Sequence, residues 1–422
     1  MCDNQKLKEK PYNNKLWIIY IILFSTILTP SIKIGNLPAF RIEQVIVVVF
    51  AIYFFIGLTL RKKIKKNDIM FPLLYSGFSF FIILSILVGS FKGIKVIVND
   101  FFEIYKIFIY LGIYLITILI VESEDDKFKI LSCIKICLVI SLIISIQQYF
   151  NLFNLNEKYV PIIAPTQFRT LVNNYPYPRV VGMTSNPNVY SAMPSIGAII
   201  SWSMYLATKS TKNLIFMIIF VFGTLMTLSR SGFIFMLAGI GMCTFFFIIK
   251  SNNGTSRLMR GRINIKAIGF IILAIFIIFT LGIIVFNYLP EELTWRLKRG
   301  LNLELDSSFQ ARLRNWGEHI EYFKSSPIFG LGPAKSIDYK AHVDNEWLLF
   351  LRQYGIVGTL YFVSIFVLPF LRSKNKFYKY LYYSVLVGSA LYMIPAIIYN
   401  SFQLMPIIMI LAGLVLNSEN LC

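Results

Sequence analysis

Five arginines stand in or beside the polar stretches that separate apolar segments of this chain. They are Arg169, Arg179, Arg230 in "TLSRSG", and Arg312 and Arg314 in "QARLRNW". Because an arginine inside a bilayer is costly, one placed among apolar segments is expected to have a function. The planar guanidinium group can bond two phosphate oxygens at once. We therefore expect Arg230, Arg312 and Arg179 to bind an anionic head group, with Arg169 and Arg314 as further candidates.

A second set of chemical groups lies in the stretch "HVDNEW", residues 342–347. His342 and Asp344 carry the imidazole and carboxylate groups that are suited to removing a proton from a hydroxyl. Asn345, beside them, is expected to contact the same substrate. Asp344 also stands where a helix would begin, so its alternative role is that of an N-cap.

The composition is that of a protein that crosses a membrane many times. Of the 422 residues, 56% are hydrophobic and 15% are charged, and the mean hydropathy is +0.66. Soluble domains carry about 25% charged residues. The net charge of +20 is therefore read as basic loops that orient the chain in the membrane, and nucleic acid is not expected as a partner. The five cysteines show no metal-binding or disulfide spacing, and we expect no cofactor, no metal and no cleavable signal peptide.

The apolar segments predict an all-α fold with about twelve transmembrane helices, forming a single integral membrane domain over residues 1–422. Prolines mark several of the segment ends, and no repeat divides the chain. The expected spans lie near residues 16–34, 42–60, 69–89, 104–121, 130–149, 190–207, 214–229, 232–249, 266–288, 355–371, 380–399 and 403–417.

Basic residues fall on alternate connections between these spans, which places the N- and C-termini in the cytoplasm. They are "RKKIKK" at 61–66, Lys209 and Lys212, Arg257, Arg260 and Arg262, and Arg372, Lys374, Lys376 and Lys379. Two long loops, 150–189 and 289–354, then face outward, together with the turn that holds Arg230. The arginine-bearing segments are thus expected to converge on one outer face.

The late outer loop is expected to contain an amphipathic helix that lies across the membrane surface. Its apolar residues recur at steps of three and four, which predicts a buried stripe. The stripe consists of Phe309, Leu313, Trp316, Ile320 and Phe323. Arg312 flanks this stripe, so either it faces a cavity beneath the helix or its charged end merely reaches for water.

Three segments resemble the superfamily of O-antigen ligases and Wzy-type polymerases. They are "TLSRSG" (227–232), "GMTSNPNVYSAM" (182–193), and "RLRNW" with "SPIFGLGP" followed by "DNEWLLFLRQYGIVGT". The last segment is the most specific, because Asn345 is followed by nine residues and then by Gly355, Gly358 and Thr359, in register with the ligase motif. The resemblance extends over roughly residues 180–360.

One position departs from the ligases, which have a histidine, thought to be their base, where this chain has Asp344. The resemblance therefore implies a Wzy-type polymerase with a GT-C-like fold. Such an enzyme joins repeat units linked to undecaprenyl diphosphate at the outer face of the bacterial inner membrane and uses neither nucleotide sugar nor metal. It further implies the lipid bilayer, a chain-length regulator and a flippase as partners. The alternatives are an O-antigen ligase, a peptidoglycan polymerase, and a flippase or transporter of lipid-linked sugars.

Overall fold

The computed structural model describes residues 15–31, 41–58, 66–172, 178–251, 307–338, 344–371, 373 and 375–417. Within these ranges every regular element is helical, which confirms the all-α fold. The α-helices are α1 Leu16–Leu28, α2 Ile42–Leu58, α3 Lys66–Phe91, α4 Phe102–Ile120, α5 Glu124–Phe150, α6 Asn156–Ile163, α7 Phe168–Val172, α8 Pro187–Thr208, α9 Thr211–Met226, α10 Arg230–Ser251, α13 Ser307–Ser325, α14 Lys335–Asp338, α15 Glu346–Val367, α16 Lys376–Tyr392 and α17 Met405–Leu416. The 3-10 helices are Val98–Phe101, Leu152–Asn154, Pro165–Gln167 and Leu368–Phe370.

Every expected span inside the described ranges overlaps one of these helices, and the span expected at 266–288 lies outside them. In the described part of the chain, five helices are long and apolar enough to cross a membrane. They are Met70–Phe91, Val98–Ile120, Glu124–Phe150, Arg230–Ile249 and Glu346–Phe370. Shorter apolar helices accompany them at Leu16–Leu28, Thr211–Met226 and Met405–Leu416. The chain is therefore a polytopic helical membrane protein, while the total of twelve spans stays a prediction.

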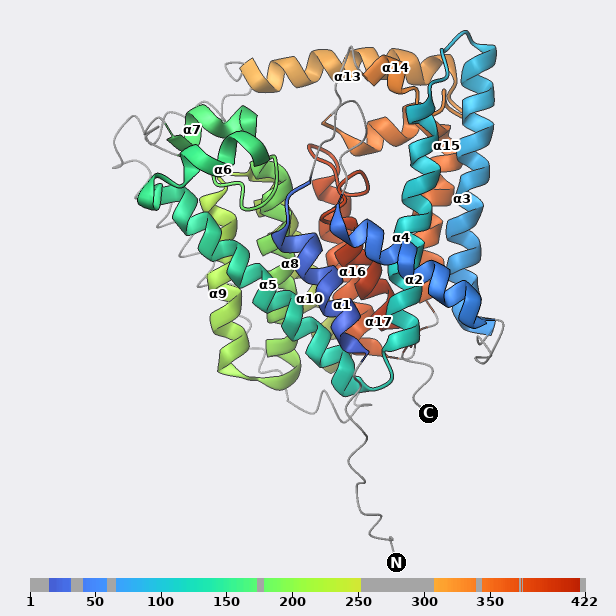
Figure 1. Ribbon diagram of the computed structural model, residues 1–422. Coiled ribbons are helices and arrows are strands. Elements are labelled where there is room, and N and C mark those ends of the chain that lie inside the picture. The colour runs from blue at the N-terminus through green and yellow to red at the C-terminus, as the bar shows by residue number, and fades with distance from the viewer. Residues whose placement is uncertain are drawn as a thin grey trace, which may run out of the picture.

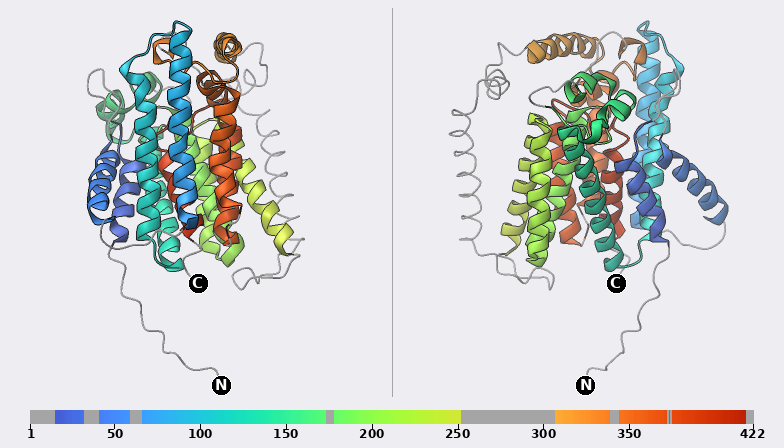
Figure 2. Two further views of the ribbon diagram at one scale, coloured as in Figure 1. Left: turned by 90° about the vertical axis from the view of Figure 1, so that its right-hand side faces the viewer. Right: turned by 60° about the vertical axis from the view of Figure 1, so that its left-hand side comes forward.

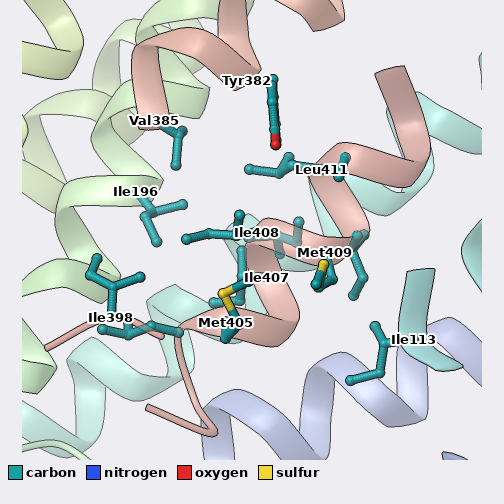
Figure 3. Packing of buried hydrophobic residues seen from close by; sticks show 14 of the residues in the cluster. Ile113, Ile196, Tyr382, Val385, Ile398, Met405, Ile407, Ile408, Met409 and Leu411 are labelled. Carbon is teal, nitrogen blue, oxygen red and sulfur yellow. The ribbon is translucent and has the colours of Figure 1, made fainter. Parts of the chain in front are cut away.

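The helices form a bundle around α17, all of whose residues are buried. Its sequence, "MPIIMILAGLVL", is apolar on every side, so each face requires an apolar neighbour. α4 and α16 pack against it, and Figure 3 shows its side chains between Ile196 of α8 and Ile113 of α4. Around this centre α8 packs against α9 and α10, α10 against α16, and α3 against α15.

The two long connections meet at one end of the bundle. α6 and α7 come from the first connection and α13 and α14 from the second, and all of them lie at the same end (Figure 1). There α13 lies across the helices below it, and the left view of Figure 2 shows it end-on. We refer to this end as the α13 end.

The amphipathic helix exists as expected, and three residues of its predicted stripe, Phe309, Trp316 and Phe323, are half-buried, but the other two are exposed. Leu313 is 42% exposed and Ile320 is 40% exposed, whereas His319 is fully buried. The reason is that His319 Nδ1 lies 3.3 Å from Nη1 of Arg352, which is itself fully buried. A buried guanidinium group needs polar partners, so α13 turns its histidine inward. Arg312 lies seven residues before His319, about two helical turns, and therefore shares this inward face.

The helix expected at 380–399 ends earlier, because α16 stops at Tyr392. The segment 393–404, between α16 and α17, consists mainly of turns. Ile398, Tyr399 and Leu404 are nevertheless buried. Irregular backbone at this depth needs polar partners from elsewhere in the protein, and Glu346 supplies several of them.

Candidate active site at the α13 end

The helix α15 is broken at Gly355, and the segment after α13 fills the break. Gly355 has φ 64° and ψ −171°. The N–H groups of Ile356 and Val357 bond to the carbonyl oxygens of Pro327 and Ile328 at 2.8 and 3.2 Å. A Cβ atom at position 355 would stand 2.2 Å from the Ile328 oxygen. A residue with a Cβ atom therefore cannot replace Gly355, the first glycine of "GIVGT", unless the backbone moves.

The same segment also bonds to α15 on the other side of the break. The N–H groups of Leu331 and Gly332 bond to the carbonyl oxygens of Arg352 and Gln353, both at 2.9 Å. Protein groups thus replace the helical bonds that the break removes, as irregular backbone in a membrane protein requires. The "FGLGP" stretch and the "GIVGT" stretch are two halves of one structural unit.

Arg352 fixes α13 on top of this unit. Its guanidinium group lies between His319 of α13 and the carbonyl oxygen of Pro333, with Nη2 3.1 Å from that oxygen. Gln353 Nε2 donates to the same oxygen at 3.1 Å. The buried arginine therefore holds three segments together and leaves the ligand-binding role to other arginines.

An ion pair between Arg312 and Asp344 joins α13 to the start of α15. Arg312 Nε lies 3.1 Å from Asp344 Oδ2, and the two side chains are 26% and 43% exposed. Among the described residues this contact uses only Nε of Arg312. Its two terminal nitrogens and the second carboxylate oxygen of Asp344 can therefore contact a ligand.

The N-cap of α15 is Asn345 and not Asp344. Asn345 Oδ1 accepts from the N–H of Leu348 at 3.0 Å. The capping interpretation of Asp344 is therefore wrong, because the neighbouring amide takes that role. Asn345 retains its amide N–H groups for a ligand, and its use as a cap fixes where they lie.

Glu346 is the neighbour whose importance sequence reasoning missed. Its buried carboxylate accepts the N–H groups of Ile398, Tyr399 and Asn400 at 2.5, 3.0 and 2.8 Å, and the side-chain amide of Asn400 at 2.9 Å. It thereby satisfies the irregular backbone of the 393–404 segment. The signal in the sequence was an acidic residue directly before a long apolar run.

A buried charge cluster continues from Asn400 toward α14. Lys106 Nζ donates to Asn400 Oδ1 at 2.5 Å and to Glu103 Oε1 at 2.7 Å. Lys335 Nζ lies 3.1 Å from the same Glu103 oxygen. This cluster, Glu103, Lys106, Lys335, Asn400 and Glu346, fixes α14, in the second long connection, to α4. Lys106 lies inside an expected span, and an ionisable residue there is a signal of function or buried structure.

A second basic group surrounds the starts of α8 and α10. Arg179 Nε donates to the carbonyl oxygen of Thr227 at 3.1 Å, and Arg179 Nη2 donates to Asn188 Oδ1 at 2.8 Å. Ser229 Oγ donates to the same Asn188 oxygen at 3.2 Å. Arg230 is the next residue, is exposed, and begins α10. The structure thus brings Arg179 and Arg230 to one place, with Asn188 between their segments.

The end of α16 connects this second group to the start of α15. The Tyr392 hydroxyl donates to the carbonyl oxygen of Asn188. One residue later, the Met393 oxygen accepts the N–H of Glu346 at 2.9 Å. Trp347 Nε1 donates to the Ala390 oxygen at 2.7 Å. The region of Arg179 and Arg230 and the region of Arg312 and Asp344 therefore both contact residues 390–393, at the end of α16.

Of the remaining predicted residues, two are exposed and one lies outside the described part. Arg169 is exposed on the short helix α7, and Arg314 is exposed on α13. His342 lies outside the described residues. In the ranges that the structure describes, no group of three histidine, cysteine, aspartate or glutamate side chains could hold a metal ion.

The comparison with known protein families finds one match. Residues 215–363 match the family model described as O-antigen ligase. The match includes Arg230, Arg312, Asp344 and the broken helix at Gly355, and it confirms the resemblance seen in the sequence. No curated protein sequence matches the chain. Over residues 215–363 the chain is therefore similar to the O-antigen ligase family.

Proposed function

We propose that the protein is a metal-independent glycosyltransferase that joins oligosaccharide repeat units, each linked to undecaprenyl diphosphate, into an O-antigen or a related surface polysaccharide. The α13 end is the reaction site and faces outward from the bacterial inner membrane. The N- and C-termini are then cytoplasmic. The family match supports an enzyme of surface-polysaccharide assembly. That the reaction is polymerisation is the more specific part of the proposal.

The Arg312–Asp344 pair is the observation that carries this proposal. It places a cation and a carboxylate 3.1 Å apart, from two different segments, at a half-exposed position. A surface ion pair contributes little to stability, whereas the broken helix, Arg352 and Glu346 already hold these segments. The pair is therefore free to act on a ligand that needs both a cation and a base.

The reaction that fits this pair is the displacement of a lipid diphosphate by a sugar hydroxyl. The hydroxyl oxygen of the acceptor forms a bond to the anomeric carbon of the donor glycan, and the bond from that carbon to the diphosphate oxygen breaks. The acceptor proton passes to the free oxygen of Asp344. Arg312 stabilises the charge that develops on the leaving diphosphate, where fixed donors are most effective.

Arg230 and Arg179 support a second diphosphate contact, since both substrates of a polymerase carry one. Arg230 begins a helix of 22 residues, so the positive end of the helix dipole lies beside its guanidinium group. Arg179 is oriented by Asn188 and Thr227. We assign this basic group to the diphosphate of the acceptor or the growing chain.

The outward orientation rests on the basic residues at the opposite end. The helix α9 separates Lys209 and Lys212, which stand at its start, from Arg230, which follows its end. Lys376 and Lys379 stand at the first turn of α16, and Tyr392 at its other end contacts the Asn188 backbone. The lysine-bearing end is then cytoplasmic under the positive-inside rule.

The second candidate is ligation, in which the finished glycan is transferred to a different lipid acceptor. The description of the matching family favours it. Asp344 at the position of the ligase histidine favours polymerisation. A flippase and a chain-length regulator remain the partners expected for a polymerase of this kind.

The test uses purified full-length protein in lipid discs, with lipid-linked repeat units as both donor and acceptor, chelator present and ATP absent. Polymerisation predicts a ladder of products that stay attached to the lipid diphosphate. Arg312→Ala and Asp344→Asn are expected to lose the ladder. Lys324→Ala, which removes an exposed charge from the same helix, is expected to keep it. Transfer only to added lipid A would support ligation, and no transfer to either acceptor would overturn the proposal.

A further inference from the structure

A stripe of exposed apolar side chains runs along α5 up to its last residue. It consists of Ile136, Ile140, Ile143 and Phe150, which are 56%, 40%, 60% and 64% exposed. The steps of four, three and seven residues keep these side chains on one face of the helix. Because α5 is long and apolar enough to cross a membrane, this exposed face lies against hydrocarbon.

Gln147 stands on the same face of α5, and its polar atoms are used inside the protein. Its Nε2 donates to the carbonyl oxygen of Leu152 and to Oδ1 of Asn156, both at 3.3 Å. Its Oε1 accepts the hydroxyl group of Tyr159 at 2.5 Å. A polar group that faces lipid needs such partners within the protein. The apolar stripe can therefore remain in hydrocarbon as far as Phe150.

Beyond α5 the exposed apolar surface continues on the next turn and on one face of α6. Phe153 in this turn is 89% exposed, and Leu155 and Ile162 are 36% and 79% exposed. The other face of α6 is fully buried at Asn156 and Val160. In Figure 1, α5 rises to α6 and α7 at the left side of the bundle. An exposed apolar patch of this kind marks an interaction surface.

The backbone of the turn holds Phe153 in an unfavourable conformation. Its φ is 58°, and the nearby Asn151 and Asn154 have φ values of 45° and 54°. Asparagine tolerates this left-handed region, whereas a bulky side chain rarely adopts it. Backbone strain of this kind is a reason to look for a function. A turn in water gains nothing from an exposed phenylalanine, whereas a turn in a membrane gains the burial of the ring.

The polar side chains beside the patch are of the kinds found at a membrane surface. Tyr149 is 37% exposed, and its ring centroid lies 5.2 Å from that of Phe150. Tyrosine is enriched at the level of the lipid head groups. Lys158 is exposed on the same face of α6 as Leu155 and Ile162, where a long side chain can extend its charged end to the head groups. The patch thus combines an apolar surface with groups suited to lipid phosphates.

We propose that the turn after α5 and the exposed face of α6 insert into the membrane leaflet on the side of the α13 end. Phe153 and Ile162 then lie among the acyl chains. The bilayer is the occupant because the patch continues the face of α5 that crosses the membrane. The first long connection, expected from the sequence to be an outer loop, is thereby held on the membrane surface, independently of the reaction at the α13 end.

The test uses spin labels on single cysteines in the full-length protein, after its five natural cysteines are replaced by serine. The labels are attached at Phe153→Cys and Ile162→Cys, with Ile140→Cys on α5 as the membrane reference. Glu157→Cys, exposed on another side of α6, is the matched control. The protein is placed, one copy per disc, in lipid discs of phosphatidylethanolamine and phosphatidylglycerol. Collision rates of each label with oxygen and with a polar nickel complex are then measured.

The ratio of oxygen to nickel collisions at residues 153 and 162 is expected to exceed that at residue 157 at least about threefold, because a polar complex is excluded from hydrocarbon. It should approach the ratio at residue 140. Ratios equal to that at residue 157 would place the segment in water and overturn the proposal. Low collision rates with both reagents would overturn it as well, since another part of the same chain would then cover the patch. The proposed reaction stands in either case.

A second measurement needs no substitution and serves if the cysteine-free protein fails to accumulate. A phospholipid that carries a diazirine near the start of its acyl chain is irradiated with the wild type in the same discs. Mass spectrometry is expected to find the label on residues 149–163 as well as on α5. Labelling of α5 without residues 149–163 would overturn the proposal.

Discussion

Two groups of charged residues lie at the α13 end, and they differ in how completely their polar atoms are used. Glu346 is fully buried and accepts four hydrogen bonds within the protein. Asp344, two residues earlier, is 43% exposed and has one arginine contact. A carboxylate that is surrounded by donors stabilises a fold, whereas one with a free oxygen can exchange a proton with a substrate. The comparison separates residues that build the site from residues that act in it.

The largest expected effect comes from Glu346→Ala. The substitution leaves three backbone N–H groups of the 393–404 segment without their acceptor. The free energy of unfolding is expected to fall by about 3–5 kcal/mol, measured as thermal unfolding in detergent and as protein level in membranes. Glu346→Gln, which keeps one acceptor oxygen, is expected to lose less. An unchanged unfolding temperature in the alanine variant would show that the buried carboxylate is dispensable.

Arg312→Ala is expected to lower the activity and to leave the stability almost unchanged. Polymer formation per amount of folded protein should fall by about 100- to 1,000-fold, as it does when a fixed transition-state donor is removed. The unfolding temperature should stay within about 1–2 °C of the wild type, because a half-exposed pair contributes less than about 1 kcal/mol.

The exchanged pair Arg312→Asp with Asp344→Arg sharpens this prediction. It restores the ion pair in reverse, so a purely structural pair would regain activity. We expect the protein to accumulate normally and to remain inactive, since the cation and the base have changed places. Restored laddering would assign the pair to the fold.

Gly355→Ala tests the broken helix. The added Cβ would stand 2.2 Å from the Ile328 carbonyl oxygen, at a φ of +64°. The expected cost is about 1–3 kcal/mol of stability, seen as a lower unfolding temperature. Gly317→Ala, in α13, where a Cβ meets nothing within 4 Å, is the matched control.

Arg230→Lys is expected to have a smaller effect on activity. A lysine keeps the charge at the start of α10 but cannot bond two phosphate oxygens together. The KM for the lipid-linked substrate is expected to rise by about tenfold, with little change in stability. Full activity of the lysine variant would show that Arg230 contributes only its positive charge.

The smallest effect is expected from Arg169→Ala, since its side chain is exposed on α7. Activity should remain within about twofold of the wild type, as for a surface substitution. A loss as large as that of Arg312→Ala would mean that the first long connection, which contains α7, forms part of the active site.

The helices, and the gathering of arginine-bearing segments at one end of the bundle, could be predicted from the sequence, because apolar length and loop charge depend on local composition. The inward face of α13 could not, since Leu313 and Ile320 suggested an apolar stripe while the buried Arg352 required His319. The early end of α16 was missed for a similar reason. The 393–404 segment leaves the helix because Glu346, about fifty residues away, supplies its hydrogen-bond acceptors, and no local pattern contains that partner.

The most direct measurement concerns which side of the membrane the Arg312–Asp344 pair faces. Leu313→Cys, in a variant whose five natural cysteines are replaced by serine, would be exposed to a membrane-impermeant maleimide on intact spheroplasts. The account predicts labelling without permeabilisation, because Leu313 is 42% exposed and α13 is assigned to the outer face. Labelling only after the membrane is opened would place the pair in the cytoplasm and contradict the proposed reaction.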